Sequence, residues 1–420
     1  MEDGCVQFGP SACPRESRRT WLTAVLLGVA ALTIFLLGIN KPGIPFFDEA
    51  IHVAAAKTFL AGGSTNPEVP PLGELLIAGG IEIFGDGPLG WRVAGAVFGA
   101  FTLVGLFVWV YLLLHDYALA LTAAILALFN NFLFVMSRAA IVDIFLVAFL
   151  IWGLVAFTML LEMDELSATQ RRMLVAAAGT LFGLACACKW NGVDTLAVVI
   201  FISIGLLWEA SRSENEAILR HGRNLTQAGI VPLFFCLLMV PVVAYSATFW
   251  PLFHSLHHSF SVRELVTMNV TIWRMHRVDQ GNHVLGSPWY SWILQVSPLR
   301  SFSYLVGNWV IMWGGLLALA FNIRRMRTLL PEALVVSLYA ANLLQWAITP
   351  QKHLYYYYYF PAAMFLGAAI PVALHRLPPR VLGMRLSVIC VVAAGCAFLY
   401  CLPNMAHLEA PFDCALTCWP

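Results

Sequence analysis

The sequence predicts an all-α polytopic membrane protein, and its composition and its apolar segments both lead to that class. Hydrophobic residues make up 60% of the 420-residue chain and charged residues only 11%, whereas a typical soluble domain is about 25% charged. Apolar stretches of about 20 residues, the length that crosses a bilayer as a helix, recur along the chain. The formal net charge of +1 gives no indication of a nucleic-acid partner.

Eleven apolar segments are expected to be transmembrane helices. They are residues 21–38, 89–114, 117–135, 140–161, 172–188, 193–208, 225–249, 302–321, 331–349, 355–375 and 381–402. The first continues into Ile39-Asn40-Lys41-Pro42 without a small-residue cleavage site, so we expect a span and not a removed signal peptide. Residues 1–402 should form one transmembrane module, with 403–420 as a short outer tail.

The orientation follows from the basic residues, which stay preferentially in short cytoplasmic loops. A cytoplasmic N-terminus places 14 of the 24 basic residues there: Arg15, Arg18, Arg19, Arg171, Arg172, Arg212, Arg220, Arg223, Arg324, Arg325, Arg327, Arg376, Arg380 and Arg385. The two longest loops, 39–88 and 250–301, then lie outside. Any functional site must therefore be built from the spans and these outer loops.

The outer loops carry further patterns. Apolar residues at helical spacing predict two short amphipathic helices along the membrane surface, at 48–60 and 71–84, separated by helix-breaking residues at 62–67. The mixture of aromatic and polar residues in 250–301 favours a folded lid or substrate surface. The ten cysteines have no metal-ligand spacing, and a disulfide among Cys401, Cys414 and Cys418 is left open.

Two adjacent carboxylates, Asp48 and Glu49, follow the first span at the outer face. Such a pair can supply a general base beside a second carboxylate that shifts its pKa or binds a hydroxyl. The alternative is a helix N-cap followed by an acidic first turn.

Four further ionisable residues lie at the outer edges of spans, where charge is costly and therefore informative. They are Arg92, Arg138, Asp143 and Lys189. Cations gathered there can hold a phosphate, and carboxylates can handle a hydroxyl proton. The alternative is that the long side chains extend to lipid headgroups and that Arg138 simply pairs with Asp143.

Lys352 and His353 precede the tyrosine run 355–359 at the outer end of the tenth span. Both could neutralise a lipid phosphate, although tyrosines favour the membrane interface whatever the function. No HExxH motif or His/Glu cluster occurs, so no protein-bound metal is expected.

Together these segments resemble the protein O-mannosyltransferase family and its bacterial relatives, the lipid-carrier-dependent glycosyltransferases of the GT-C class. The resemblance rests on Phe47-Asp48-Glu49, Pro70-Pro71-Leu72-Gly73 with Leu75-Leu76-Ile77-Ala78, Gly90-Trp91-Arg92, Ser137-Arg138 with Asp143, Gly183-Leu184-Ala185 with Lys189-Trp190-Asn191-Gly192 and, more weakly, His283 with Ser287-Pro288-Trp289 and Trp292. It covers roughly residues 40–300.

The resemblance implies an inverting transfer of a sugar, usually mannose, from a polyprenyl-phosphate carrier to a hydroxyl, usually of protein Ser or Thr. Asp48 resembles the catalytic aspartate, and Glu49 would support the geometry. The carrier and substrate site would include Arg92, Arg138, Asp143, Lys189, Trp190, His283, Lys352 and His353. No cofactor is implied beyond the lipid-linked sugar. Likeness to bacterial members implies the cell (inner) membrane, with the active site facing the periplasm.

Two departures from the family pattern affect this expectation. Val69 stands where members usually have His, and Glu74 where they usually have Lys. The phosphate contact that this Lys would make is therefore not carried over, and the identity of the sugar is left open. Two alternatives also remain open. A lipid or cell-wall glycan could be the acceptor, as in the related aminoarabinose transferases. A transporter or flippase is the other alternative, but it would place charges near the bilayer midplane and not at one face.

Overall fold

The computed structural model describes residues 14–276, 287–295, 305–349, 354–378 and 380–406, and within these ranges the regular structure is helical throughout. The helices are α1 (Pro14–Leu36), α2 (Glu49–Leu60), α3 (Leu72–Phe84), α4 (Pro88–Leu114), α5 (Tyr117–Leu128), α6 (Asn131–Met136), α7 (Asp143–Glu162), α8 (Ala168–Cys188), α9 (Gly192–Ala210), α10 (Glu216–Ala228), α11 (Ile230–Ala247), α12 (Trp250–Ser255), α13 (Val262–Met275), α14 (Trp289–Ile293), α15 (Trp309–Asn322), α16 (Leu330–Ile348), the 3-10 turn η2 (Tyr356–Tyr359), α17 (Phe360–His375) and α18 (Arg380–Met405).

The predicted all-α membrane class is confirmed, and each of the eleven expected segments contains a helix. In the described part of the chain, eight helices are long and apolar enough to cross a membrane, while α5 and α15 are apolar but shorter. The expected span 117–135 is in fact two helices. Asn130 has an extended backbone and its side chain accepts from the Phe132 N–H (3.0 Å), so it ends α5 and begins α6.

The start of the seventh expected span was also wrong. Residues 225–228 belong to the polar helix α10, and the membrane helix α11 begins at Ile230. Gly229 separates the two helices because its φ of +91° suits glycine and few other residues.

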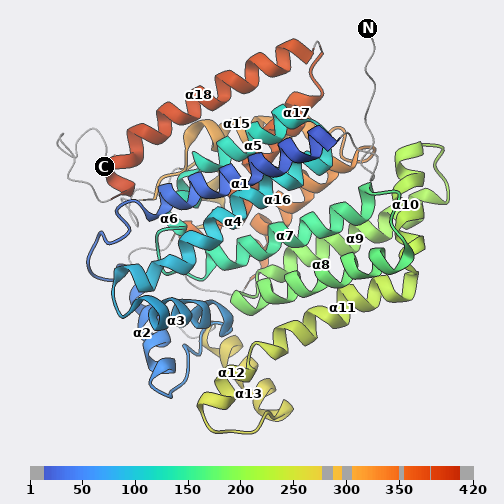
Figure 1. Cartoon of the computed structure of the whole chain (residues 1–420). Coiled ribbons are helices and arrows are strands. Elements are labelled where there is room, and N and C mark those ends of the chain that lie inside the picture. Colours follow the sequence, from blue (N-terminus) through green and yellow to red (C-terminus); the bar gives the residue numbers. More distant parts are fainter. Residues whose placement is uncertain (1–13, 277–286, 296–304, 350–353, 379, 407–420) are drawn as a thin grey trace.

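The long helices run side by side in one bundle, with α18 along one edge (Figure 1). α7 and α17 are the most enclosed, since 83% and 94% of their apolar windows are buried inside the protein, against 17% for α1 and 22% for α18. The first pair therefore packs against protein on all sides. The second pair presents its apolar side chains to the surroundings, as expected for lipid contact.

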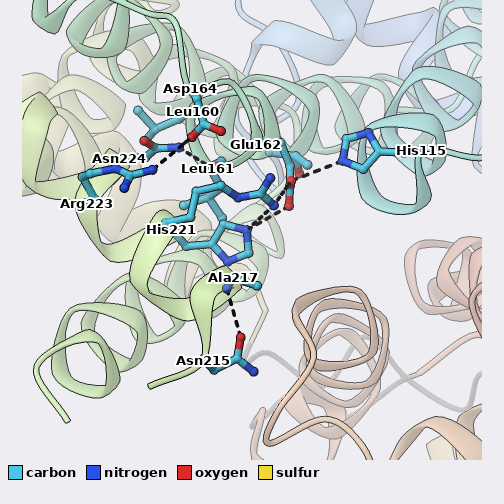
Figure 2. Close-up of polar contacts among 12 residues, drawn as sticks. His115, Leu160, Leu161, Glu162, Asp164, Asn215, Ala217, His221, Arg223 and Asn224 are labelled. Carbon is cyan, nitrogen blue, oxygen red and sulfur yellow. Dashed lines mark hydrogen bonds and ion pairs between the residues drawn. The ribbon is translucent and has the colours of Figure 1, made fainter. Parts of the chain in front are cut away.

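At one end of the bundle, a cluster of polar side chains surrounds Glu162, the last residue of α7. Its carboxylate accepts from Arg220 (2.6 Å) and lies 2.9 Å from His221 Nε2 and 3.3 Å from His115 Nε2. Figure 2 shows His221, from α10, and His115, from the turn after α4, directed at Glu162. The cluster ties α10 and the α4–α5 turn to α7, at the end that the basic-residue count predicts to be cytoplasmic.

The opposite end holds the first long loop, and both of its predicted short helices are confirmed as α2 and α3. α3 lies tightly on α4, because a Cβ at Gly80 would stand 2.4 Å from the carbonyl oxygen of Gly90. α12 and α13 of the second long loop lie at the same end (Figure 1). Phe59 of α2 packs against Phe249 and Phe253 there. Two loops far apart in the sequence therefore share one end of the bundle.

Candidate active site

Asp48 is the N-cap residue of α2 and points toward the C-terminal half of the chain. Its Oδ2 accepts a hydrogen bond from the Tyr357 hydroxyl. Phe47 adopts a left-handed backbone (φ +53°), and its ring lies edge-on to Tyr355 and Tyr357 at 5.8 and 5.7 Å. This turn and its aromatic contacts aim the Asp48 side chain. The other carboxylate oxygen, Oδ1, accepts from no residue in the part of the chain that the structure describes.

Burial raises the pKa of Asp48 above its usual value of 3.8, and the nearby charge of Asp143 adds to that effect. The Tyr357 hydrogen bond, then the charges of His52 and Lys189, oppose the rise. A carboxylate with a raised pKa is a stronger base than an ordinary aspartate, provided that it remains ionised at the working pH.

Lys189 and Asp143 form an ion pair near Asp48. The Lys189 Nζ lies 2.9 Å from Asp143 Oδ1 and 3.2 Å from Oδ2, and it stands 4.0 Å from the ring centroid of Tyr358. The negative face of an aromatic ring attracts a cation, so the Tyr358 ring helps to hold the Lys189 ammonium in place. The alternative reading, in which Asp143 simply pairs with Arg138, does not hold, because the α8–α9 junction brings Lys189 to Asp143 instead.

Glu49 lies next to Asp48 in sequence but faces the other way, into the protein. Both Glu49 and Arg92 are fully buried, and they pair bidentately at 2.7 Å for each of two bonds. Glu49 also accepts from the backbone N–H groups of Phe46 (3.2 Å) and Ala140 (2.9 Å). Of the two adjacent carboxylates, Asp48 is thus open to a reaction partner, and Glu49 joins three parts of the chain.

Arg92 lies at the start of α4 as expected, but its partners do not support the expected contact with a carrier phosphate. Besides Glu49 it donates to the carbonyl oxygens of Ile39 (2.8 Å), Pro42 (2.9 Å) and Ile44 (3.3 Å). A guanidinium has five N–H groups, and these bonds use all five. No N–H of Arg92 is left for a phosphate in this arrangement, so we infer that Arg92 holds the segment between α1 and α2 in place.

Arg138 remains a candidate residue for binding an anion such as a phosphate. One of its terminal nitrogens, Nη1, donates to the carbonyl oxygens of Phe35 (2.9 Å) and Leu37. Burial and then the charge of Arg92 lower the pKa of Arg138 to about 10, which still leaves it charged at neutral pH. Arg138 is 7% exposed.

Glu74, the departure from the family pattern, is also fully buried. Its carboxylate lies 2.9 Å from His52 Nδ1 and accepts from the Asn66 N–H at 2.8 Å. Burial raises the pKa of Glu74, and the His52 hydrogen bond opposes that rise. The position therefore links α2 to α3 through a carboxylate and provides no cation for a phosphate.

The remaining expected site residues divide into two groups. Trp190 borders the Lys189 region, donates to the Tyr245 hydroxyl (3.1 Å) and faces the His276 ring at 6.2 Å. The second group, His283, Lys352 and His353, lies outside the described residues.

A disulfide among three cysteines was left open by the sequence. Of these, Cys414 and Cys418 also lie outside the described residues, and Cys401 is a free thiol.

Sequence reasoning missed the roles of Tyr357, Tyr358 and His52. The tyrosine run was visible, but an aromatic belt at the interface explains such a run equally well. His52 lies one helical turn after Asp48, yet its partner Glu74 belongs to another helix. In the described residues no group of three His, Cys, Asp or Glu side chains is arranged to hold a metal ion.

The fold and site define a polytopic helical membrane protein of the GT-C class, with paired carboxylates and cations at one end of the bundle. The chain belongs to the dolichyl-phosphate-mannose-protein mannosyltransferase family, whose sequence model matches residues 25–257.

Relatives and solved structures agree with this placement. The polyprenol-phosphate-mannose-protein mannosyltransferase of Mycolicibacterium smegmatis is 29% identical over 279 residues (59% of this chain, 52% of the relative), and that of Mycobacterium tuberculosis is 29% identical over 272 residues (58% and 51%). The chain thus spans about half the length of these relatives.

The S. cerevisiae protein O-mannosyltransferase Pmt1-Pmt2 complex bound to the sugar donor aligns with a TM-score of 0.78 at 13% identity, covering 93% of this chain and 91% of that one. ArnT from Cupriavidus metallidurans bound to undecaprenyl phosphate aligns with a TM-score of 0.64 at 17% identity, covering 92% and 70%. At these identities the likeness shows a shared fold.

Proposed function

We propose that this protein transfers mannose from a polyprenyl-phosphate carrier to a hydroxyl of protein Ser or Thr, with inversion at the anomeric carbon. The observation that carries the proposal is the placement of Asp48, which has one oxygen held by Tyr357 and the other open, beside the Lys189–Asp143 pair. Family membership and the names of the relatives support the choice of donor and acceptor.

In the proposed reaction the acceptor oxygen attacks the anomeric carbon from the face opposite the phosphate. Asp48 takes the hydroxyl proton as the new C–O bond forms. The bond between the anomeric carbon and the phosphate oxygen breaks, and its electron pair leaves with the phosphate. Inversion follows from this single displacement.

Positive charge on the departing phosphate is the second requirement, since the leaving group gains negative charge in the transition state. Lys189 and Arg138 are the described residues proposed for this task. Asp143 would hold Lys189 in position, and Tyr357 would hold Asp48. Lys352, His353, His283 and Trp190 stay in the proposed carrier and substrate site, and the lipid-linked sugar is the only accessory group proposed.

The proposed location of the reaction is the outer face of the cell membrane. The support is the basic-residue count, which favours a cytoplasmic location for the Glu162 end of the bundle. The Asp48 end then faces outward, where a lipid phosphate at the interface can reach it.

Incubation of the purified protein with radiolabelled polyprenyl-phosphate mannose tests the function. A Ser/Thr peptide and a lipid acceptor are offered in parallel, with Asp48→Asn as the inactive control. Label on the peptide in the wild type alone is the expected result. Label only on the lipid would replace the protein acceptor with the lipid alternative. The absence of any transfer, or equal transfer by Asp48→Asn, would overturn the proposal.

A further inference from the structure

A cavity of about 550 Å³ lies at the Glu162 end of the bundle, away from Asp48. Residues of its lining that Figure 2 labels are His115, Glu162, Ala217 and His221. Further walls come from α9, from the turn between α15 and α16, from the start of α16 and from the residue that follows α17. The cavity is therefore separate from the proposed reaction site.

Three arginines line this cavity: Arg220, Arg327 and Arg376. Arg220 donates to Glu162 at 2.6 Å, and the Glu162 side chain is only 7% exposed. Arg376 donates through Nε to Glu332 at 2.8 Å, and Glu332 is fully buried. The guanidinium side chains are more open, at 32% exposed for Arg220 and 29% for Arg376. The carboxylates are thus hidden, while the cations remain accessible.

Some N–H groups of these arginines are left for a ligand. Arg376 uses Nε, and its two terminal nitrogens have no hydrogen-bond acceptor among the described residues. Arg327 is exposed in the α15–α16 turn and pairs with no residue in the ranges that the structure describes. Glu209 is an exposed acid of the same lining. With three cations against this one exposed acid, the accessible polar surface suits a phosphate.

The rest of the lining is largely apolar and reaches the outer surface of α9. Phe201 and Ile202 line the cavity, and Phe201 is 71% exposed. Only 28% of the apolar window of α9 is buried inside the protein, so this helix presents apolar side chains to its surroundings. The cavity therefore opens toward the region that lipid chains occupy.

The end of α9 indicates the depth of the cavity in the membrane. Trp208 is exposed there, and the Arg212 guanidinium lies 3.5 Å from its ring centroid. An exposed Trp is typical of the membrane–water interface. Glu209, the next residue along the chain, lines the cavity. The arginines of the cavity therefore lie near the level of lipid headgroups.

We propose that this cavity binds a phospholipid of the bilayer, with the phosphate held by Arg327 and Arg376 and an acyl chain along the apolar side chains of α9. Accessible guanidinium groups and an apolar wall open to lipid identify this ligand together, since a soluble phosphate would use only the first. The site goes beyond the proposed transfer and does not depend on it. A ligand that binds only the folded protein stabilises it, so the lipid raises the Tm.

Lipid titration of the purified protein in detergent tests the assignment. Native mass spectrometry measures binding, and thermal unfolding measures stability. Phosphatidylglycerol is the probe, diacylglycerol with the same chains lacks the phosphate, and glycerol phosphate lacks the chains. Phosphatidylglycerol should bind saturably and raise the Tm. The other two should bind at least about 10-fold more weakly, because each offers one of the two features.

Two substitutions each remove one feature. Arg327→Gln removes an exposed guanidinium and should weaken phosphatidylglycerol binding about 10-fold. Phe201→Ser removes part of the apolar wall and should weaken phosphatidylglycerol as well. The matched controls are Arg324→Gln, in the same turn but outside the cavity lining, and Phe235→Ser, an exposed ring on α11. Both controls should bind phosphatidylglycerol as the wild type does.

Equal affinity in Arg327→Gln and Arg324→Gln would overturn the phosphate contact. Diacylglycerol binding as tightly as phosphatidylglycerol would reduce the site to an apolar surface, and glycerol phosphate binding as tightly would make it a site for soluble phosphate. Either result overturns the proposal. Tighter, Arg327-dependent binding of polyprenyl phosphate would assign the cavity to the carrier and overturn it too. Mannose transfer is no part of this readout, so failure of the proposed function is seen separately.

Discussion

The Tyr357 hydroxyl donates a hydrogen bond to Asp48 across a sequence separation of 309 residues. Tyr357 lies outside the segment 25–257 that matches the family model. The proposed base is therefore oriented by a part of the chain beyond that segment. Tyr357 is itself 4% exposed and belongs to η2, at the start of the most enclosed helix, α17.

Replacing Asp48 by Asn should lower the transfer rate about 100- to 10,000-fold, the usual contribution of a general base. Binding of polyprenyl phosphate should stay unchanged, because the amide keeps the shape of the side chain. Turnover and carrier binding are measured on the same preparation. Wild-type turnover in Asp48→Asn would exclude this residue as the base.

The pH profile of kcat/KM should reflect the raised pKa of Asp48. A base works only when deprotonated, so the rate falls as the pH drops through that pKa. The acid limb should lie above 3.8, the ordinary value for aspartate. Tyr357→Phe removes a hydrogen bond that lowers the pKa of Asp48, so it should move the acid limb to still higher pH and lower the rate about 10-fold.

Tyr339→Phe is the matched control for that experiment. Its hydroxyl is also buried, but it bonds to the Tyr359 hydroxyl (2.9 Å) and not to a carboxylate. The acid limb should stay in place in this variant. An equal movement in both variants would show that a general loosening of the aromatic core, and not the Tyr357–Asp48 bond, sets the profile.

Glu49→Ala should destabilise the protein strongly, because it leaves the Arg92 guanidinium buried without its carboxylate. Breaking a buried ion pair from one side costs about 3–5 kcal/mol. Lys57→Ala breaks an ion pair whose side chains are 50% and 46% exposed and should cost less than about 1 kcal/mol. Thermal unfolding in detergent compares the two. Similar Tm values would contradict a structural role for the Glu49–Arg92 pair.

Arg138→Lys should keep part of the activity and Arg138→Ala very little, with the loss appearing as weaker donor use. Arginine holds phosphate oxygens through two parallel N–H groups, whereas lysine offers a single point of charge. Kinetics at varied donor concentration are the measurement. A loss confined to the acceptor KM would remove Arg138 from the phosphate site.

The proposed orientation predicts opposite labelling at the two ends of the bundle. Ser64→Cys, in the exposed α2–α3 loop, should react with an impermeant thiol reagent in sealed cells. Ser211→Cys, at the exposed α9–α10 turn, should react only after the membrane is opened. The unmodified chain measures the background from its own cysteines. Labelling at 211 in sealed cells would reverse the topology and with it the outward-facing site.

Local composition was sufficient to predict much of the fold. Apolar length located a helix in each of the eleven segments, and helical periodicity located α2 and α3 correctly. Apolar length and helical periodicity are both set by residues close together in the sequence, so they can be recognised without knowledge of the fold. The errors fell at 117–135 and 225–249, where a single Asn or Gly ends one helix and begins another. Such a break is decided by one side-chain or backbone conformation, and hydropathy averaging conceals it.

The sequence by itself determined which residues carry charge at the α2–α3 end of the bundle, and it singled out Asp48, Glu49, Arg138 and Lys189. Only the tertiary structure decided their partners. Asp143 pairs with Lys189 and not with Arg138, and Glu49 with Arg92. The physical reason is that a buried charge must find a partner wherever packing brings one. That partner lies 43 residues away for Glu49 and 309 for Asp48, far beyond the reach of local patterns.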